Sequence, residues 1–181
     1  MISPFYFIVE PVGGKSYDSV RDNGLIVSVS KEDHKSTNRF ATVLNVPIGY
    51  SGGIKPGAIV VVHHNVFRSY YDMKGKERKS FSHIKDNLYY LETDQFYLYK
   101  NNDSEDWVAN PPYCFVKPVS KKQGLSTMEA GIEEPLVGEI VYSNSFNKGT
   151  MVSFQPDSEY EFKVDGEKVY RMFDKNICVL L

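Results

Sequence analysis

The chain has 181 residues, of which 24% are charged and 41% hydrophobic, and its formal net charge is −2. This composition excludes a disordered chain, and the small charge excludes a basic field that would attract nucleic acid or anionic lipid. The start, "MISPFYFIVEPV", has no basic leader, and no apolar run approaches the roughly 20 residues that cross a bilayer. We therefore expect a cytoplasmic protein without a membrane partner.

Short runs rich in Val, Ile, Tyr and Phe, broken by Gly, Pro, Asn and Asp, follow one another along the chain, and helical periodicity is hard to find. Many short strands at regular spacing indicate an all-β sandwich or barrel. In chain order the predicted strands are 5–12, 39–46, 58–67, 87–93, 95–100, 113–119, 137–144, 150–156, 159–166, 168–173 and 176–181.

The sequence also repeats itself. "SPFYFIVEPV" (3–12) matches "NPPYCFVKPV" (110–119), "IKPGAIVVV" (54–62) matches "FNKGTMVSF" (146–154), and "IKDNLYYLETDQFYLYK" (84–100) matches "VDGEKVYRMFDKNICVLL" (164–181). The second match aligns Gly57 with Gly149, and the third aligns Asp94 with Asp174. Because the three matches keep their order, we predict two copies of one fold, at 1–100 and 113–181, joined by a polar linker at 101–112.

Both copies resemble the GroES-type (chaperonin-10) co-chaperonin family. "FIVEPV", the polar run with "NGLIV", "ATVLNVPIG", "IKPGAIVVV" and the ending "NLYYLETDQFYLYK" are similar to the family's first strand, mobile loop, second strand, Gly-turn strand and C-terminal hairpin. The second copy resembles the same landmarks, above all in its last residues. The resemblance covers nearly everything except the linker and an insertion near "FRSYYDMKGKER" (67–78), and it implies two tandem GroES-like β-barrels.

The resemblance also implies a function and a binding site. The family caps an ATP-bound GroEL-type chaperonin as a sevenfold ring and helps to enclose a client protein. Its mobile loop docks through a glycine and an apolar tripeptide, which here are Gly24 and Leu25, Ile26 and Val27, in a loop at about 13–38. The expected protein is thus a non-enzymatic co-chaperonin, a homo-heptamer that needs no cofactor and binds no nucleic acid, in the host cytoplasm if it is phage-encoded.

Two departures from the family pattern shape this expectation. Neither "GYSGGIK" (49–55) nor "SNSFNK" (143–148) can build a normal roof hairpin. In the second loop, 120–135, Leu125 and Ile132 each follow a glycine, but the residues after them are Ser, Thr or Glu instead of further apolar residues. We therefore expect one docking loop per chain. Because seven positions cannot be filled evenly by pairs, we expect first copies to face the chaperonin and second copies to form an upper layer.

Other patterns leave two alternative functions open: a barrel that binds single-stranded nucleic acid through the Tyr cluster at 87–100, and a structural ring or adaptor with a GroES-like fold. The simpler interpretation of the Tyr cluster is that its side chains fill the core and the interfaces between subunits. His63 and His64, taken as strand neighbours, point to opposite faces and so do not share a metal. Cys114 and Cys178 are expected to be buried free thiols. No catalytic motif places a nucleophile with its base.

Overall fold

The computed structural model describes residues 3–16, 21–22, 25–26, 37–120 and 133–181, and within them the chain is all-β, as predicted. It divides into two compact units, Met1–Asp106 (unit 1) and Trp107–Leu181 (unit 2). The segment expected as a linker is thereby split between them. In the part of the chain that is described, no helix has the length and apolar character needed to cross a membrane.

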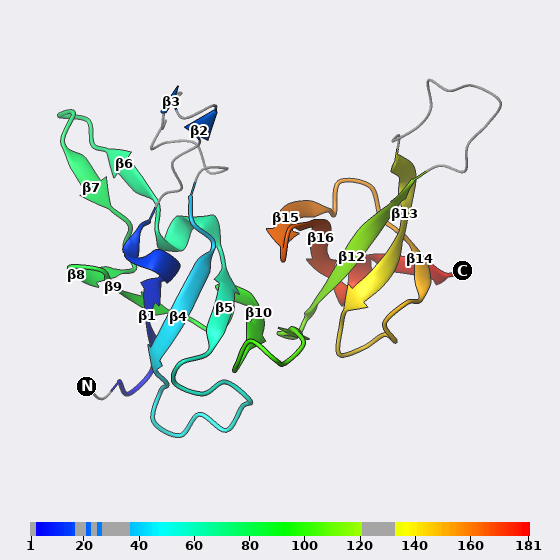
Figure 1. Cartoon of the computed structure of the whole chain (residues 1–181), viewed down its shortest axis with the longest axis horizontal. Helices are drawn as coiled ribbons and strands as arrows, with labels where there is room; N and C mark the ends of the chain where they lie inside the picture. Colours follow the sequence, from blue (N-terminus) through cyan, green and yellow to red (C-terminus); the bar gives the residue numbers. More distant parts are fainter. Residues whose placement is uncertain (1–2, 17–20, 23–24, 27–36, 121–132) are drawn as a thin grey trace. The chain divides into compact units, whose positions relative to one another are not determined.

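The strands that unit 1 contributes to its main antiparallel sheet follow the order β10-β5-β4-β1-β9-β8 (Figure 1). Its strands are β1 (Phe7–Pro11), β4 (Phe40–Asn45), β5 (Ile59–Val62), β8 (His83–Lys85), β9 (Leu88–Leu91) and β10 (Phe96–Lys100). Two small hairpins project from connections: β2 (Arg21–Asp22) with β3 (Leu25–Ile26), and β6 (Ser69–Tyr71) with β7 (Glu77–Lys79). Short 3-10 turns, η1 (Val12–Gly14) and η3 (His64–Val66), follow β1 and β5.

Unit 2 has the same strand order, β17-β14-β13-β12-β16-β15. Here the strands are β12 (Tyr113–Ser120), β13 (Glu133–Tyr142), β14 (Met151–Phe154), β15 (Tyr160–Val164), β16 (Glu167–Phe173) and β17 (Ile177–Leu180), with the 3-10 turn η5 (Asp174–Asn176) before β17. The two-residue strand β11 (Val108–Ala109) lies near its start.

The two sheets agree residue by residue. Val9 pairs with Val43 in unit 1 as Val116 pairs with Ile140 in unit 2, and the register shifts just before each of these pairs. The last strands, β10 and β17, each skip one residue against the neighbouring strand, at Tyr97 and at Cys178. Because a bulge interrupts the ladder of hydrogen bonds, two bulges at matching places are a specific feature rather than a general property of sheets.

A shared turn explains the sequence match at Gly57 and Gly149. Both glycines have positive φ, 92° and 87°, a conformation that costs a side chain about 1 kcal/mol or more. Each donates its N–H to the strand before it, Gly57 to Val43 O at 2.7 Å and Gly149 to Ile140 O at 2.8 Å. The turn therefore sets the register of the two strands that it joins.

Each unit has a hydrophobic core of its own, made by residues of the sheet and, in unit 1, also by residues of the connections. In unit 1 this core contains Phe7, Val9, Ala41, Val43, Ile54, Ala58, Val60, Val62, Val66, Phe67, Tyr89, Leu91 and Phe96. In unit 2 it is smaller and contains Cys114, Val116, Ile140, Val152, Phe154 and Met172. Several positions match, but Phe7 of unit 1 is replaced by Cys114 in unit 2.

The expected closure into barrels is not present in the hydrogen-bonded sheets of the described ranges. The strand order of each unit is linear, and its end strands, β10 with β8 and β17 with β15, do not pair with each other. Each sheet is therefore open, and the all-β class is what these strands establish.

Candidate functional site

The predicted docking segment, residues 24–27, belongs to the connection between β1 and β4. Leu25 and Ile26 form strand β3, which pairs with β2 in the register Arg21 with Ile26 and Asp22 with Leu25. Two residues, 23 and 24, join these strands, which is the length of the tightest β-hairpins. Gly24 and Val27 lie outside the described residues, as do 17–20 and 28–36.

The two ends of this connection are held together by Asn38, whose side chain is almost fully buried. Its Nδ2 donates to the carbonyl oxygens of Val12, at 2.9 Å, and Lys15, at 3.0 Å. Its Oδ1 accepts from the N–H of Phe40 at 2.9 Å, and its own N–H donates to Ser16 O at 3.0 Å. Asn38 therefore satisfies main-chain groups on both sides of the loop, and fixes where the loop leaves and re-enters the unit.

Further contacts tie the outgoing end to the core. The hydroxyl groups of Ser16 and Tyr89 lie 3.0 Å apart, and Tyr89 is fully buried. Asn87 donates from Nδ2 to Gly14 O at 3.1 Å. Residues 14–16, at the edge of the range expected to be mobile, are thus bonded to the β8–β9 turn and to β9.

The matching connection of unit 2 is built differently. Strands β12 and β13 stay paired up to Ser120 with Glu133, and residues 121–132, including Leu125 and Ile132, lie outside the described ranges. Glu133 accepts from Lys168 Nζ at 2.8 Å and from the Tyr170 hydroxyl at 2.6 Å. The Lys168 ammonium, and then the Tyr170 hydroxyl, lower the pKa of Glu133. A strand ladder and an ion pair thus hold the base of this loop.

The other candidate residues have the following environments. Tyr89 and Tyr97 of the Tyr cluster are buried, which confirms their predicted role in the core. The prediction for His63 and His64 was wrong in its geometry, because η3 begins at His64 and the two rings stack with centroids 4.2 Å apart.

Both cysteines are free, as predicted, but only Cys114 is buried, whereas Cys178 is exposed. Burial, reinforced by Asp174, raises the pKa of the Cys114 thiol to about 12, so this sulfur is a packing group. Cys178 lies at the bulge of β17.

Sequence reasoning missed two residues that organise the units. Asn38 stands between the polar run and the strand at 39–46, where an asparagine that bonds nearby main chain is common. Trp107, assigned to the linker, is buried, and its Nε1 donates to Asp165 Oδ2 at 2.8 Å in the β15–β16 turn. A lone tryptophan in a polar segment was the available signal.

Within the described ranges, no group of three or more His, Cys, Asp and Glu side chains is placed to hold a metal ion. Comparison of the chain with models of known protein families gives no match, and comparison with curated proteins gives none either.

Proposed function

We propose that the chain is a co-chaperonin of the GroES type, with two fused GroES-like units, which caps an ATP-bound GroEL-type chaperonin through the loop that carries Leu25 and Ile26. The observation that carries the proposal is this loop. It connects two neighbouring strands of the sheet, β1 and β4, its ends are held by Asn38, and it carries Leu25 and Ile26 on a short hairpin within a polar run of the sequence.

The energetics suit a docking loop that binds the chaperonin weakly on its own and firmly when several loops are held in one ring. Burial of three side chains such as Leu25, Ile26 and Val27 contributes about 4–9 kcal/mol. Ordering about ten loop residues costs about 1–2 kcal/mol each, so that a single loop binds weakly. Several loops on one ring act at high effective concentration, which gives reversible capping.

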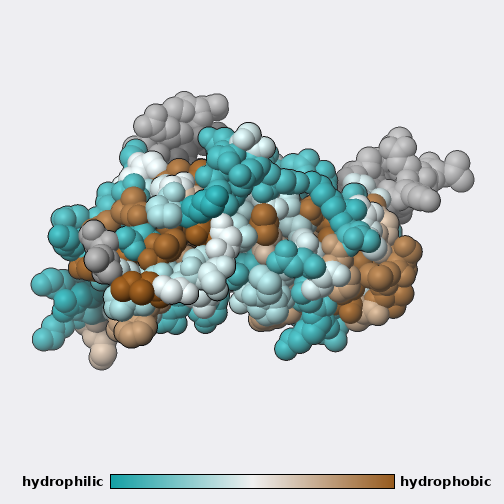
Figure 2. Space-filling model, turned by 90° about the horizontal axis from the view of Figure 1, so that it is seen from below, coloured by the Kyte–Doolittle hydropathy of each residue, from teal (hydrophilic) through white to brown (hydrophobic). Residues whose placement is uncertain are grey.

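An exposed sheet edge supports assembly into a ring. Strand β17 ends the strand order of unit 2, and Val179, Leu180 and Leu181 at its end are 53%, 57% and 67% exposed. Figure 2 shows apolar surface on the side of unit 2 where Figure 1 places β14 and the C-terminus. An apolar edge strand is a template for pairing with another chain. We propose a closed homo-heptamer with unit 1 facing the chaperonin and unit 2 in an upper layer.

The decisive experiment is co-elution of the protein with a purified GroEL-type chaperonin, with and without ATP. We expect binding with nucleotide only, and an unbound protein whose mass by light scattering is seven times 20.7 kDa. Leu25→Ser and Ile26→Ser should each weaken binding at least tenfold, because each removes about 1.5–3 kcal/mol of apolar burial per loop.

The matched controls are Leu125→Ser and Ile132→Ser in the second loop, which should change binding less than twofold. If these weaken binding as much as Leu25→Ser, both loops dock. If the chain does not bind the chaperonin and is retained on single-stranded DNA, the nucleic-acid alternative replaces the proposal. A ring that binds neither is a structural ring or adaptor.

A further inference from the structure

The β6–β7 hairpin leaves unit 1 at the same end of the sheet as the docking loop, which connects β1 to β4. At this end, Pro11 of β1 pairs with Ala41 of β4. Val62, the last residue of β5, donates its N–H to Arg39 O at 2.8 Å, so the connection that contains the hairpin starts beside the point where the docking loop re-enters the sheet. Figure 1 shows β6 and β7 beyond this end, on the side where β2 and β3 lie. A partner that binds the docking loop is therefore close to the hairpin as well.

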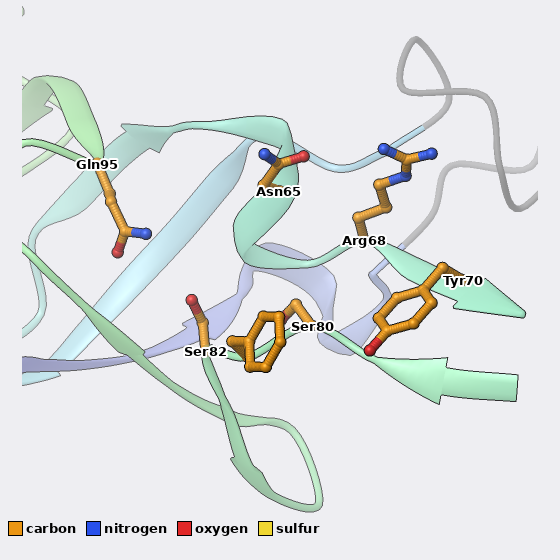
Figure 3. A pocket seen from close by; sticks show the side chains of 7 residues that line it. Asn65, Arg68, Tyr70, Ser80, Ser82 and Gln95 are labelled. Atoms are coloured by element: carbon orange, nitrogen blue, oxygen red, sulfur yellow. The ribbon is translucent and has the colours of Figure 1, made fainter. Parts of the chain in front are cut away.

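The root of the hairpin is fixed in unit 1. Phe67, two residues before β6, is buried, and its ring packs edge to face on Tyr89 with the centroids 4.8 Å apart. Ser80, directly after β7, donates its hydroxyl to Val66 O at 2.6 Å. Figure 3 shows Tyr70 of β6 and Ser80 at this root, where both line a hollow of about 390 Å³. Side chains at both ends of the hairpin therefore anchor it to the unit.

The tip of the hairpin is ordered by Asp72. Its Oδ1 accepts from the N–H groups of Lys74 and Lys76, both at 2.9 Å, and its Oδ2 accepts from Arg78 Nε at 3.0 Å. The main chain closes the same turn, since Asp72 O accepts from the N–H of Gly75 at 2.8 Å and from that of Lys76 at 2.9 Å. A segment that is ordered before it binds loses less conformational entropy on association. The hairpin is thus suited to act as a preformed contact.

The outer part of the hairpin exposes apolar side chains that do not pack in the core. Met73 at the tip is fully exposed, and Tyr71 is half exposed. Their neighbours Lys74, Lys76 and Lys79 are exposed too, and the ammonium groups form no ion pair with any described residue. Tyr and Met are enriched at protein–protein interfaces, and the flexible thioether adapts to irregular surfaces. This combination is typical of a contact surface for an anionic protein partner.

The charge of the insertion sets it apart from the rest of the chain. Residues 67–79 contain five cations and two anions, a net charge of +3, so the other residues of this chain of net charge −2 carry −5. In unit 2 the same connection is residues 155–159, which contain Asp157 and Glu159 and no Lys or Arg. The cations of the insertion are Arg68, Lys74, Lys76, Arg78 and Lys79, and its anions are Asp72 and Glu77. An acidic surface is therefore attracted to this connection of unit 1 and repelled by its counterpart in unit 2.

We propose that the β6–β7 hairpin is a second contact with the chaperonin, and that it binds an acidic patch on the chaperonin surface beside the site that takes the docking loop. Lys74, Lys76 and Lys79 face the carboxylates of this patch, and Met73 and Tyr71 pack within the contact. The inference rests on the proposed function, because the docking loop is what brings the chaperonin to this end of unit 1. Exposed charges act mainly on the rate of association, whereas the apolar contacts of the docking loop act on dissociation.

Surface plasmon resonance of the full chain on an immobilised GroEL-type chaperonin with ATP, in about 50 mM and about 500 mM salt, tests the second contact. The double variant Lys74→Gln, Lys76→Gln should lower the association rate constant at least fivefold in the lower salt, while the dissociation rate constant changes less than twofold. In the higher salt it should associate like the parent chain, because salt screens exposed charges. The variant should fold, because the bonds that Lys74 and Lys76 make to Asp72 come from main-chain N–H groups.

Met73→Ser should weaken binding at least threefold at both salt concentrations, and it cannot act through the core because the side chain is fully exposed. The matched control is the double variant Lys55→Gln, Lys163→Gln, which removes the same charge from exposed positions outside the insertion. Lys55 lies in the connection from β4 to β5, at the other end of the unit 1 sheet. This control should change the association rate constant less than twofold. Equal losses in the two double variants indicate only nonspecific attraction and overturn the inference.

The parent chain separates this inference from the proposed function. If the parent binds with ATP and the hairpin variants bind equally well, the second contact is overturned and the docking loop acts alone. If the parent does not bind, the proposed function fails and the second contact fails with it. If the hairpin variants bind the chaperonin like the parent but lose binding to oligo(dT) or to phosphatidylserine vesicles, the hairpin serves a nucleic acid or a membrane, and the chaperonin contact is again overturned.

Discussion

Units 1 and 2 share their strand order and pairing register, and differ in their core side chains and in the lengths of their connections. Strand order, pairing register and the bulges at Tyr97 and Cys178 agree. The cores differ, because Phe7 of unit 1 is Cys114 in unit 2, and at the bulges the buried Tyr97 corresponds to the exposed Cys178. Main-chain hydrogen bonds and glycine turns therefore preserve the fold where side-chain volume has changed.

The connections differ even more than the cores. Unit 1 carries the loop fastened by Asn38 and the insertion with its hairpin, whereas unit 2 joins the same strands by an extended ladder and a short turn. Binding residues commonly lie on loops held by a rigid scaffold. The difference thus assigns both proposed binding sites to unit 1, and leaves unit 2 the simpler form of the fold.

Replacing Asn38 should have the largest effect on this comparison. Asn38→Ala leaves the carbonyl groups of Val12 and Lys15 and the N–H of Phe40 without their partner, which should cost about 2–3 kcal/mol. Urea unfolding followed by far-ultraviolet circular dichroism measures the loss. The fluorescence of Trp107, the single tryptophan and a residue of unit 2, should not change its midpoint. A loss of unfolding free energy below about 0.5 kcal/mol would mean that the hydrogen bonds of Asn38 do not hold the ends of the loop together.

A second test concerns matched positions on the second strand of each sheet. Gly138 of unit 2 pairs with Pro118 as Ala41 of unit 1 pairs with Pro11. A Cβ on Gly138 would lie 2.7 Å from the Lys117 carbonyl oxygen and would also overlap Val116. Gly138→Ala should therefore destabilise unit 2 by about 1–3 kcal/mol, seen as a lower urea midpoint of Trp107 fluorescence.

The matched control for this change is Ala41→Gly. It removes a buried Cβ and adds backbone entropy to the unfolded chain, so it should cost about 1 kcal/mol in unit 1 and leave the fluorescence midpoint unchanged. An unaltered midpoint in Gly138→Ala would show that unit 2 has room for the side chain that unit 1 carries.

The repeated part of the fold could be predicted from the sequence because its signals are local. Runs of β-branched and aromatic residues mark the strands, and Gly57 and Gly149 mark the shared turn. The alignment of Asp94 with Asp174 was displaced by one residue, since the turns correspond at Gln95 and Asn176, whose amides accept the same kind of bond. Gln and Asn can both accept this main-chain hydrogen bond, so the corresponding residues are not identical and an alignment by identity does not match them.

The open sheets, the buried Trp107, the fastening by Asn38 and the position of the β6–β7 hairpin could not be predicted, because each depends on residues distant in sequence. Asn38 and Val12 are separated by the whole loop, and the hairpin starts beside that loop only because Val62 bonds to Arg39. The short strand at Leu25 and Ile26 was not among the strands predicted from the sequence, which include none between residues 12 and 39. Its docking role remains a prediction from the resemblance.

The smallest effect is expected at the base of the second loop, where Glu133 pairs with Lys168. Their side chains are 38% and 42% exposed, and such exposed pairs contribute about 0.2–1 kcal/mol. Glu133→Gln should therefore cost about 0.5 kcal/mol at pH 7, much less than Asn38→Ala.

The pKa of Glu133 is lowered below its ordinary value of 4.5, so the stabilisation by the ion pair is complete above pH 4.5 and is lost as the pH falls through the folded-state pKa. The urea midpoints of Glu133→Gln and the parent chain, followed by Trp107 fluorescence, should accordingly converge in acid and in 1 M salt. The neighbouring, exposed Glu134 offers the matched change, and Glu134→Gln should match the parent chain at pH 7. A cost above 2 kcal/mol for Glu133→Gln would mean that the ion pair, rather than the β12–β13 ladder, holds this loop, and that the two units fasten their loops with equal strength.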